Sequence, residues 1–535
     1  MGNIYYNGNI ITMTDIETVE AVYEKNGIIE FVGDIEDIKK ISNNEDNWIN
    51  LDGMTLIPSF IDSHSHITAL ASTLNLCNLS EAKNFDDIVS LINKFKNEMK
   101  IKQNEWIICF GYDNNFLEEK KHPDKLLLDI FESNPVLLSH SSGHMGVLNS
   151  LAMELMNIDN TTEVPKGGKI GKFDNSNELN GYFEETAFIN ISSKLPQPTF
   201  EQKVQSFKKA EDIYFRNGIT TVQDGLVGEN DFNFLKDMSE QNIIDIDLIV
   251  YTDLKNYPDI PLKNNNFLNN YINNLKIGGY KIFLDGSPQG KTAYLREPYE
   301  NSDNYRGYPI YKNEELIKFF EKAINDDIQI IAHSNGDAAS EQYIESYKKA
   351  LENLGDIKTN IRPVLIHGQL LGLDQLEDIK NYDIIPSFFV SHVYHWGDIH
   401  KINFGNRAEN ISPLKSALDN DILFTIHTDT PVIPPNIIEA IWIAVNRITK
   451  NGEILGDNQK IAPYDALKSV TYNAAYQYFE EDKKGSIEKG KFADFVILDK
   501  NLLDSSEYSK KNIKDVKILK TIKRGKVVFD INNEL

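Results

Sequence analysis

A regular alternation of short apolar runs with amphipathic segments constrains the fold of this chain more than any other feature. The alternation occupies residues 199–480 and includes one earlier run, at 56–61. It is typical of parallel strands connected by helices, the arrangement of α/β proteins. The predicted strands are 56–61, 219–222, 246–251, 280–284, 329–332, 362–366, 384–389 and 422–426. Eight such strands predict a (β/α)8 barrel.

The two ends of the chain have a different pattern, in which short strands are separated by tight turns. The predicted strands are 4–7, 10–13, 21–23, 28–32, 493–498, 516–522 and 526–529, with Gly8, Asn26-Gly27 and Arg524-Gly525 as turns. Isolated hairpins are only marginally stable in water. We therefore expect residues 1–57 and 484–535 to meet as one small β-sandwich domain. Residues 58–78 and 199–483 then form the barrel.

A long segment, 79–198, lies between the first and second predicted barrel strands. It contains an amphipathic helix at 84–100 and strands at 106–110 and 135–139. A single connection between a strand and a helix is usually far shorter. We interpret this segment as an inserted α/β domain.

Charge and cysteine content narrow the classes of partner and of site. The chain has 80 Asp and Glu against 55 Lys and Arg, a formal net charge of −25, which disfavours nucleic acid and anionic membranes as partners. No apolar run approaches the ~18 residues of a membrane span. The first residues lack a secretory signal, so the expected location is the cytoplasm. Cys77 and Cys109 are the only cysteines, so any metal must be held by histidine and carboxylate.

The segment Asp62-Ser63-His64-Ser65-His66 follows the first predicted barrel strand. Side chains at i and i+2 share one face of a strand, so His64 and His66 can bind one cation together. Barrel enzymes place their sites at these carboxyl ends of strands. The alternative interpretation is a chance pair of surface histidines.

Potential ligands recur at the same position after later strands. His333 follows 329–332, His367 follows 362–366, and Asp429 comes shortly after 422–426. Each histidine alone is more often a core residue than a ligand, and an Asp before Pro431 is often a turn or capping residue. Together they predict a metal site of imidazoles and one carboxylate, which can also accept a proton from water.

Lys281 lies inside the predicted strand 280–284. A charged ammonium pointing into the barrel costs several kcal/mol unless it is paired or chemically modified. Carboxylation by CO₂ would convert it into an anionic bridging ligand. The alternative is a lysine that reaches solvent between the helices. Asp285, Asn335 and Asp337 are expected at the same rim, as substrate-pocket or loop-capping residues.

Further motifs run in a fixed order through nearly the whole chain. They are HSH at 64–66, GYDNNFL at 111–117, SSGHMGVLNS at 141–150, NGYFEETA at 180–187, KIFLDGS at 281–287, HSNGD at 333–337, IHGQ at 366–369, HTDTPV at 427–432 and GSIEKGKFADFVILD at 485–499. This set resembles the amidohydrolase superfamily. Within it, the set is most similar to amidohydrolase family 3, which includes N-substituted formamide deformylases and many uncharacterised metal-dependent hydrolases.

The resemblance implies a TIM-like metal-dependent hydrolase barrel with one or two divalent ions, zinc being expected and iron or manganese being alternatives. It implies that His64, His66 and Asp429 bind one ion and that His333 and His367 bind a second. Lys281 matches the position of a carboxylated lysine that bridges the two ions, although Glu185 of the inserted domain could supply that carboxylate instead. Substrate-lining positions of the family match His144, Glu185, His392, His395 and Trp396. Ser59 stands where the family usually has Gly, which predicts an altered entry into the first strand.

The implied activity is hydrolysis of a non-peptide C–N bond, in an amide or a formamide, to an acid and an amine. Metal ions lower the pKa of a bound water to give hydroxide. His333 assists in polarising the substrate carbonyl, while Asp429 takes the water proton and returns it to the leaving nitrogen. The alternatives are a mononuclear deaminase or cyclic-amide hydrolase, and a structural homologue without catalysis. The partner is a small-molecule substrate, and the sequence leaves open its identity and whether the chain forms a homodimer.

Overall fold

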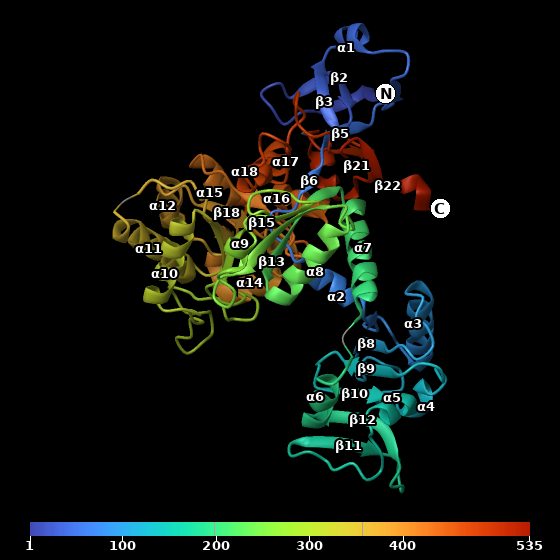
Figure 1. The fold of residues 1–535 in the computed structure, drawn as a ribbon. Coiled ribbons are helices and arrows are strands. Elements are labelled where there is room, and N and C mark those ends of the chain that lie inside the picture. The colour runs from blue at the N-terminus through green and yellow to red at the C-terminus, as the bar shows by residue number, and fades with distance from the viewer. Residues whose placement is uncertain (197, 356, 505, 535) are drawn as a thin grey trace. The chain divides into compact units, whose positions relative to one another are not determined.

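The computed structural model describes residues 1–196, 198–355, 357–504 and 506–534 (Figure 1). The chain divides into two compact units. The first consists of Met1–Ala69 and Ala210–Leu535, and the second is Leu70–Lys209. The second unit contains the segment expected to be an insertion.

An eight-stranded parallel sheet forms the centre of the first unit. In hydrogen-bonded order its strands are β6 (Phe60–Ile61), β13 (Ile219–Val227), β14 (Asp247–Asp253), β15 (Leu275–Phe283), β16 (Gln329–Ser334), β17 (Val364–His367), β18 (Ile385–Phe388) and β19 (Thr425–Ile426). This spatial order follows the sequence, as in a (β/α)8 barrel. Nearly all residues of these strands are buried, because both faces of a parallel sheet are covered.

The first and last strands of this sheet meet through the segments that follow them. The His66 N–H donates to the Thr430 carbonyl at 2.8 Å, and the Asp429 N–H donates to the His64 carbonyl at 3.0 Å. The Thr428 N–H donates to the Asp62 carboxylate at 3.1 Å. The sheet therefore curls until its edges join, and the predicted α/β barrel is confirmed.

Helices follow the barrel strands along the chain and cover the outside of the sheet (Figure 1). They include α8 (Glu229–Glu240), α10 (Asn313–Asp326), α11 (Asp337–Asn353), α12 (Leu376–Asn381), α15 (Leu414–Asp419), α16 (Ile437–Asn446), α17 (Pro463–Ser469) and α18 (Tyr472–Gln477). In α10 the buried Leu316, Phe320 and Ala323 recur at helical spacing, so one face packs on the barrel. None of the described helices has the length and apolarity needed to cross a bilayer.

Strands from both ends of the chain share a second sheet of this unit. Its order is β22 (Lys526–Asp530), β21 (Ile518–Lys523), β20 (Phe495–Leu498), β5 (Thr55–Pro58), β1 (Gly2–Ile11), β2 (Thr18–Lys25) and β3 (Ile28–Gly33), while β4 (Asn47–Asn50) pairs with β1. The antiparallel pair β5 and β20 joins the two ends. The arrangement of this sheet as a sandwich stays a prediction.

Two strand predictions are wrong. The run 56–61 is split, because β5 ends at Pro58 in the terminal sheet whereas β6 begins at Phe60 in the barrel. Ser59 lies between them, with its N–H donating to Asp494 and its hydroxyl 2.6 Å from that of Thr220. The segments 4–7 and 10–13 are one strand, β1, because Gly8 continues the strand against Leu51 and Met54 instead of forming a turn.

The second unit has its own six-stranded sheet. The order is β11 (Gly168–Lys172), β12 (Leu179–Glu185), β10 (Met145–Leu148), β9 (Val136–His140), β8 (Ile107–Tyr112) and β7 (Cys77–Asn78). The helix α3 (Phe85–Glu98) buries Ile88 and Ile92 in the core that includes both cysteines. The helix α3 and the strands β8 and β9 correspond to the helix and the two strands predicted for the inserted segment, whereas β7, β10, β11 and β12 were not predicted.

A buried cluster of charges connects the terminal sheet to the barrel. Asp247, at the start of β14, accepts a hydrogen bond from Lys484 and pairs with Lys523 at 2.7 Å and Arg524 at 3.1 Å. Burial alone would raise the pKa of Asp247, but these three cations bring it below its usual value. The carboxylate thus holds the end of β21 and its following turn against β14.

We expect Asp247→Ala to lower the free energy of unfolding by about 3–5 kcal/mol, because the buried Lys484 and Lys523 and the partly exposed Arg524 all lose this carboxylate as a partner. Urea denaturation measures this loss. Because the folded-state pKa is lowered, the stabilisation is present above the unfolded-state pKa of about 4 and is lost as the pH falls further. Asp37→Ala, which removes an exposed pair with Lys40, is the control and should leave stability nearly unchanged. Equal effects of the two substitutions would contradict the assignment.

Candidate metal centre

The carboxyl ends of the barrel strands bring together all six side chains predicted as metal ligands. They are His64 and His66 after β6, Lys281 in β15, His333 in β16, His367 at the end of β17, and Asp429 after β19. His64, Lys281 and His367 are buried, while the other three are partly exposed. The parallel sheet thus concentrates at one rim residues that are far apart in the sequence.

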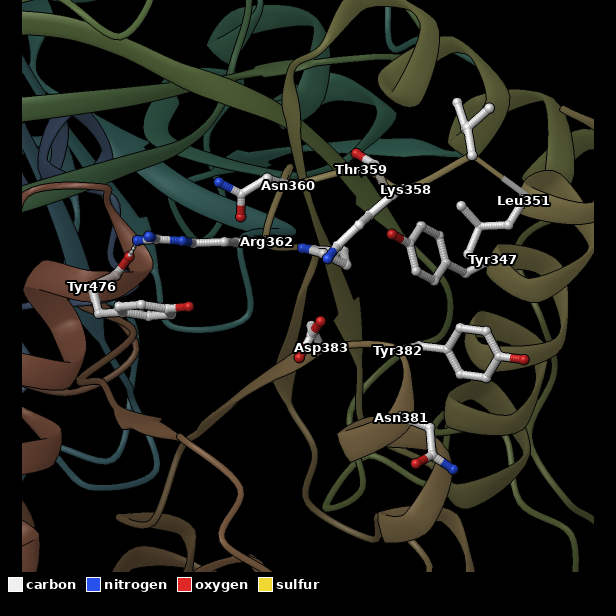
Figure 2. Close-up of a pocket in the computed structure, with 12 residues that line it drawn as sticks. Tyr347, Leu351, Lys358, Thr359, Asn360, Arg362, Asn381, Tyr382, Asp383 and Tyr476 are labelled. Carbon is white, nitrogen blue, oxygen red and sulfur yellow. Dashed lines mark hydrogen bonds between the residues drawn. The ribbon is translucent and has the colours of Figure 1, made fainter. Parts of the chain in front are cut away.

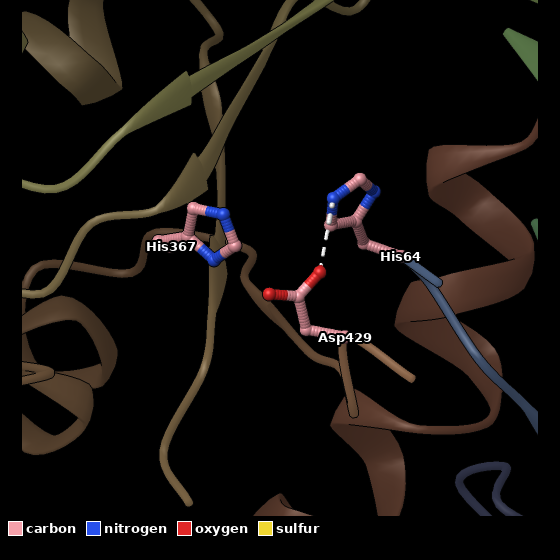
Figure 3. A group of neighbouring side chains, drawn as sticks. All are labelled: His64, His367 and Asp429. Carbon is pink, nitrogen blue, oxygen red and sulfur yellow. Dashed lines mark ion pairs between the residues drawn. The ribbon is translucent and has the colours of Figure 1, made fainter. Parts of the chain in front are cut away.

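Asp429 lies between the two histidines of the first segment. Its Oδ1 atom is 3.5 Å from Nε2 of His64 and 3.5 Å from Nε2 of His66. Ligand atoms of His64, His367 and Asp429 all lie within 4.8 Å of one another (Figure 3). Within the described parts of the chain, no other group of three His, Cys, Asp or Glu side chains meets this condition. Imidazoles and a carboxylate at this spacing fit a divalent cation.

His333 and His367 form a second pair beside the first. His333 Nδ1 lies 3.0 Å from His367 Nε2, and the ring centroids are 4.5 Å apart. Lys281 Nζ lies 3.2 Å from His64 Nε2, so the lysine is inside the barrel and does not reach the solvent between helices. The geometry therefore allows a second ion near the first.

The outer ring nitrogens of the histidines have partners that fix ring orientation. His64 Nδ1 contacts the Gln223 side-chain oxygen, and His66 Nδ1 lies 2.8 Å from the Gly225 carbonyl. His333 Nε2 lies 3.2 Å from the Gly286 carbonyl and 2.9 Å from the Asn335 amide nitrogen. When Nδ1 donates to an oxygen, the lone pair of Nε2 remains for a cation. His64 and His66 therefore present Nε2 to the site.

At His66 burial is outweighed by the Asp429 carboxylate, which raises the pKa, whereas burial keeps the other three imidazoles of the centre neutral. Burial lowers the pKa of His64 and His367 well below the usual value, and that of His333 to about 3, and the charge of Lys281 adds to this effect. Burial also lowers the pKa of Lys281 to about 7, although the Asp429 carboxylate opposes the shift. Neutral imidazole is the form that binds metal. A neutral amine is likewise the form of lysine that reacts with CO₂.

The carboxylates predicted at the rim organise its loops. Asp285 accepts from the backbone N–H groups of Tyr294, Asn335 and Gly336 at 2.8–2.9 Å. Burial raises the pKa of Asp285 to about 7, although these hydrogen bonds act in the opposite direction. Asp337 accepts from the backbone N–H of Arg296 at 2.9 Å. Their binding of substrate stays a prediction.

An aromatic group with three further histidines borders the centre. His392, at the start of α13 (His392–His395), places Nδ1 2.9 Å from His400 Nε2, and its ring centroid is 4.6 Å from that of Trp396. His395 Nε2 pairs with Glu439 at 3.0 Å. Phe389 contacts both His392 and His367, with ring centroids 4.8 and 6.1 Å apart. Contact of this group with substrate stays a prediction.

In the second unit, His144 and Glu185 lie on the neighbouring strands β10 and β12 or directly beside them. His144 Nδ1 is 3.1 Å from the Glu185 carboxylate, and both side chains are more than half exposed. They pair with one another between these two adjacent strands. Their predicted part in substrate binding, and that of Glu185 as a metal bridge, stay predictions.

Sequence reasoning missed three buried residues of this region, Gln223, His427 and Asp62. His427 Nε2 lies 3.1 Å from His367 Nδ1. Both His427 and Asp62 stand two residues before a predicted ligand, Asp429 and His64 respectively. Because i and i+2 share one face of a strand, this spacing was the signal that could have found them.

A cavity of about 240 Å³ lies at the other end of the barrel strands. Its residues Arg362 and Asp383 stand two residues before β17 and β18, at their amino ends. The Arg362 guanidinium lies 3.6 Å from the centroid of the Tyr476 ring (Figure 2). It also pairs with Glu481 at 2.8 Å. This cavity is therefore separate from the histidine cluster.

The chain is similar to several known proteins over nearly its whole length. The chain is similar to "Protein LONG AFTER FAR-RED 3" of Arabidopsis thaliana, at 27% identity covering 94% of this chain and 88% of that protein. It is 26% identical to "Putative amidohydrolase YtcJ" of Bacillus subtilis (strain 168), covering 99% and 100%. It is 22% identical to "N-substituted formamide deformylase" of Arthrobacter pascens, covering 98% and 97%.

A solved structure shows the same fold, and a family model covers most of the chain. An uncharacterized metal-dependent hydrolase from Pyrococcus furiosus superposes with a TM-score of 0.75 at 23% identity, covering 94% of this chain and 100% of that one. The model described as Amidohydrolase family matches residues 47–529. The chain therefore belongs to the amidohydrolase family.

Proposed function

We propose that this protein is a metal-dependent hydrolase that cleaves the C–N bond of a small amide or formamide. The observation that carries the proposal is the position of Asp429 Oδ1, at 3.5 Å from the Nε2 atoms of both His64 and His66. Membership of the amidohydrolase family supports a hydrolytic reaction. Similarity to a protein named as an N-substituted formamide deformylase supports the formamide.

The proposed ligands form two adjacent sets. His64, His66 and Asp429 would hold one ion, and His333 with His367 would hold a second. Zinc suits a set of imidazoles and carboxylate. A divalent ion bound there supplies a water of lowered pKa and a positive charge beside the substrate oxygen.

The proton of the attacking water is transferred by a side chain of the barrel. In the proposal, the Asp429 carboxylate accepts the proton of the attacking water and later gives it to the leaving nitrogen. Its backbone N–H is held by the His64 carbonyl at 3.0 Å, which keeps the carboxylate beside the two imidazoles. His333 is 15% exposed, so its ring can face a substrate carbonyl while His367 stays buried.

Lys281 would bridge the two sets as a carbamate. The neutral amine adds to CO₂, forming an N–C bond and releasing one proton, and thereby becomes an anion with two ligand oxygens. Its Nζ lies 3.2 Å from His64 Nε2, and no acidic side chain is within ion-pair distance of it among the described residues. Carboxylation would thus remove the cost of a buried, unpaired ammonium.

We expect His367→Asn and Asp429→Asn each to weaken metal binding by at least about 100-fold, because each removes a direct ligand. Loss of a residue that only supports a ligand already weakens binding by about 10–100-fold. Competition with a chelator and elemental analysis of the purified protein measure binding. His122→Asn, in the second unit, is the control and should keep the full metal content. Unchanged metal in both ligand variants would refute the centre.

We expect the zinc- or manganese-loaded protein to hydrolyse N-substituted formamides or N-acyl amines to an acid and an amine. Asp429→Asn should lower kcat by about 10²–10⁴-fold, as loss of a positioned proton acceptor does. Asp421→Asn, an 89% exposed carboxylate, is the control. Ammonia release from amino-substituted rings would favour the deaminase instead, and no turnover of any C–N substrate by the metal-loaded protein would favour a non-catalytic homologue.

We expect native mass spectrometry at neutral pH to show one CO₂ adduct that is lost on acidification. Lys281→Met should remove the adduct and reduce the amount of bound metal. Lys276→Met is the matched control, since Lys276 is equally buried but contacts Glu480, and should keep the adduct. An identical mass for the native and acidified protein would contradict carboxylation.

A further inference from the structure

We propose that His427 is a positioning residue, which holds His367 in the orientation and tautomer that present its Nε2 atom to a metal ion. The inference rests on the proposed role of His367 as a ligand. His427 itself is fully buried, and its ring stacks on Phe389 with centroids 5.4 Å apart. The sequence motifs and the family resemblance assign no role to His427.

A continuous chain of hydrogen bonds starts at His367 and passes through His427. His367 Nδ1 lies 3.1 Å from His427 Nε2, and His427 Nδ1 lies 2.8 Å from Ser387 Oγ. Ser387 Oγ lies 3.2 Å from Ser63 Oγ, which lies 3.1 Å from the Ile426 carbonyl oxygen. All five residues are buried, so solvent does not replace any of these partners.

The carbonyl at the end of the chain fixes the direction of every bond, because it can only accept. Ser63 donates its proton to Ile426, so Ser63 accepts from the Ser387 hydroxyl. Ser387 in turn accepts from Nδ1–H of His427. The Nε2 atom of His427 is then unprotonated and accepts from Nδ1–H of His367, which leaves the lone pair of His367 Nε2 free.

That free lone pair points to the second set of proposed ligands. His367 Nε2 is the atom that lies 3.0 Å from His333 Nδ1. Metal-binding histidines generally donate their other ring N–H to a fixed acceptor, which sets tautomer and ring orientation. The acceptor is usually a carboxylate or a backbone carbonyl. Here the acceptor is the imidazole of His427, which is held in turn by Ser387 and Ser63.

The backbone of His367 shows why an external support is needed. Its φ is +77°, in the left-handed region that side chains with a Cβ rarely adopt. Such conformations persist only where the surrounding contacts determine them. His427, held on Phe389 and Ser387, is one of those contacts, and it acts on the ring of His367 itself.

Two substitutions of similar size and polarity separate the positioning role from simple packing. In His427→Gln, the amide group occupies the position of Nε2 and can still accept from His367. In His427→Asn, the amide lies nearer the position of Nδ1, so His367 loses its acceptor. We expect the Asn variant to bind zinc about 10–100-fold more weakly than the unmodified protein, and the Gln variant to differ by no more than about threefold.

Zinc affinity is measured by chelator competition on the full-length protein, with His367→Asn as the reference for complete loss of a ligand. Equal affinity of the Gln and Asn variants would overturn the inference. Losses in both as large as in His367→Asn would mean that His427 is itself a ligand, which also overturns it. Full zinc binding by His367→Asn would instead refute the proposed centre.

Nitrogen-15 NMR of the zinc-loaded, unmodified protein tests the same inference without any variant that could misfold. We expect His367 and His427 both to carry their proton on Nδ1. A proton on Nε2 of His427 would reverse the chain and overturn the proposal.

Ser387→Ala should shift the His427 signals and lower zinc affinity less than His427→Asn does.

Discussion

Closure of the parallel sheet between its first and last strands is the constraint on which the site depends. Backbone hydrogen bonds link His64 with Asp429 and His66 with Thr430, and the buried Asp62 carboxylate binds Thr428. These contacts join segments more than 360 residues apart in the sequence. Without them, the HSH motif and the Asp429 segment would lie at opposite edges of an open sheet. The same bonds that complete the barrel thus complete the candidate metal centre.

Burial sets the chemistry of that centre. Imidazoles removed from water lose their affinity for a proton, so His64, His333 and His367 are neutral donors at physiological pH. The buried Lys281 is the exception, since its ammonium has no acidic partner within ion-pair distance among the described residues. A divalent ion therefore stabilises this group, which consists of neutral imidazoles around one carboxylate and one destabilised cation, more than water does. The hydrogen bonds behind each ring, to Gln223, Gly225 and His427, then decide which nitrogen faces inward.

The sequence predicted those parts of the fold that depend on local periodicity. Apolar runs identified the barrel strands, and the i, i+2 spacing identified His64 and His66. The prediction from the sequence was wrong where one apolar run belongs to two different sheets. The run 56–61 is apolar throughout because its first half is buried in the terminal sheet and its second half in the barrel. Gly8 resembled a turn residue, but it is needed where a strand passes close to Leu51 and Met54. His427 was overlooked because its partner, His367, is remote in the sequence and close only in space.

The sequence by itself determined the types of ligand and the strands that carry them. Two cysteines excluded a thiolate site, and histidines with one aspartate at strand ends left imidazole and carboxylate as donors. Only the tertiary structure decided which nitrogen of each ring is free, that Lys281 points inward, and that Asp285 binds three backbone N–H groups. The physical reason is that parallel strands fix where side chains emerge, whereas the orientation of a buried side chain depends on partners that barrel closure alone brings within hydrogen-bonding distance.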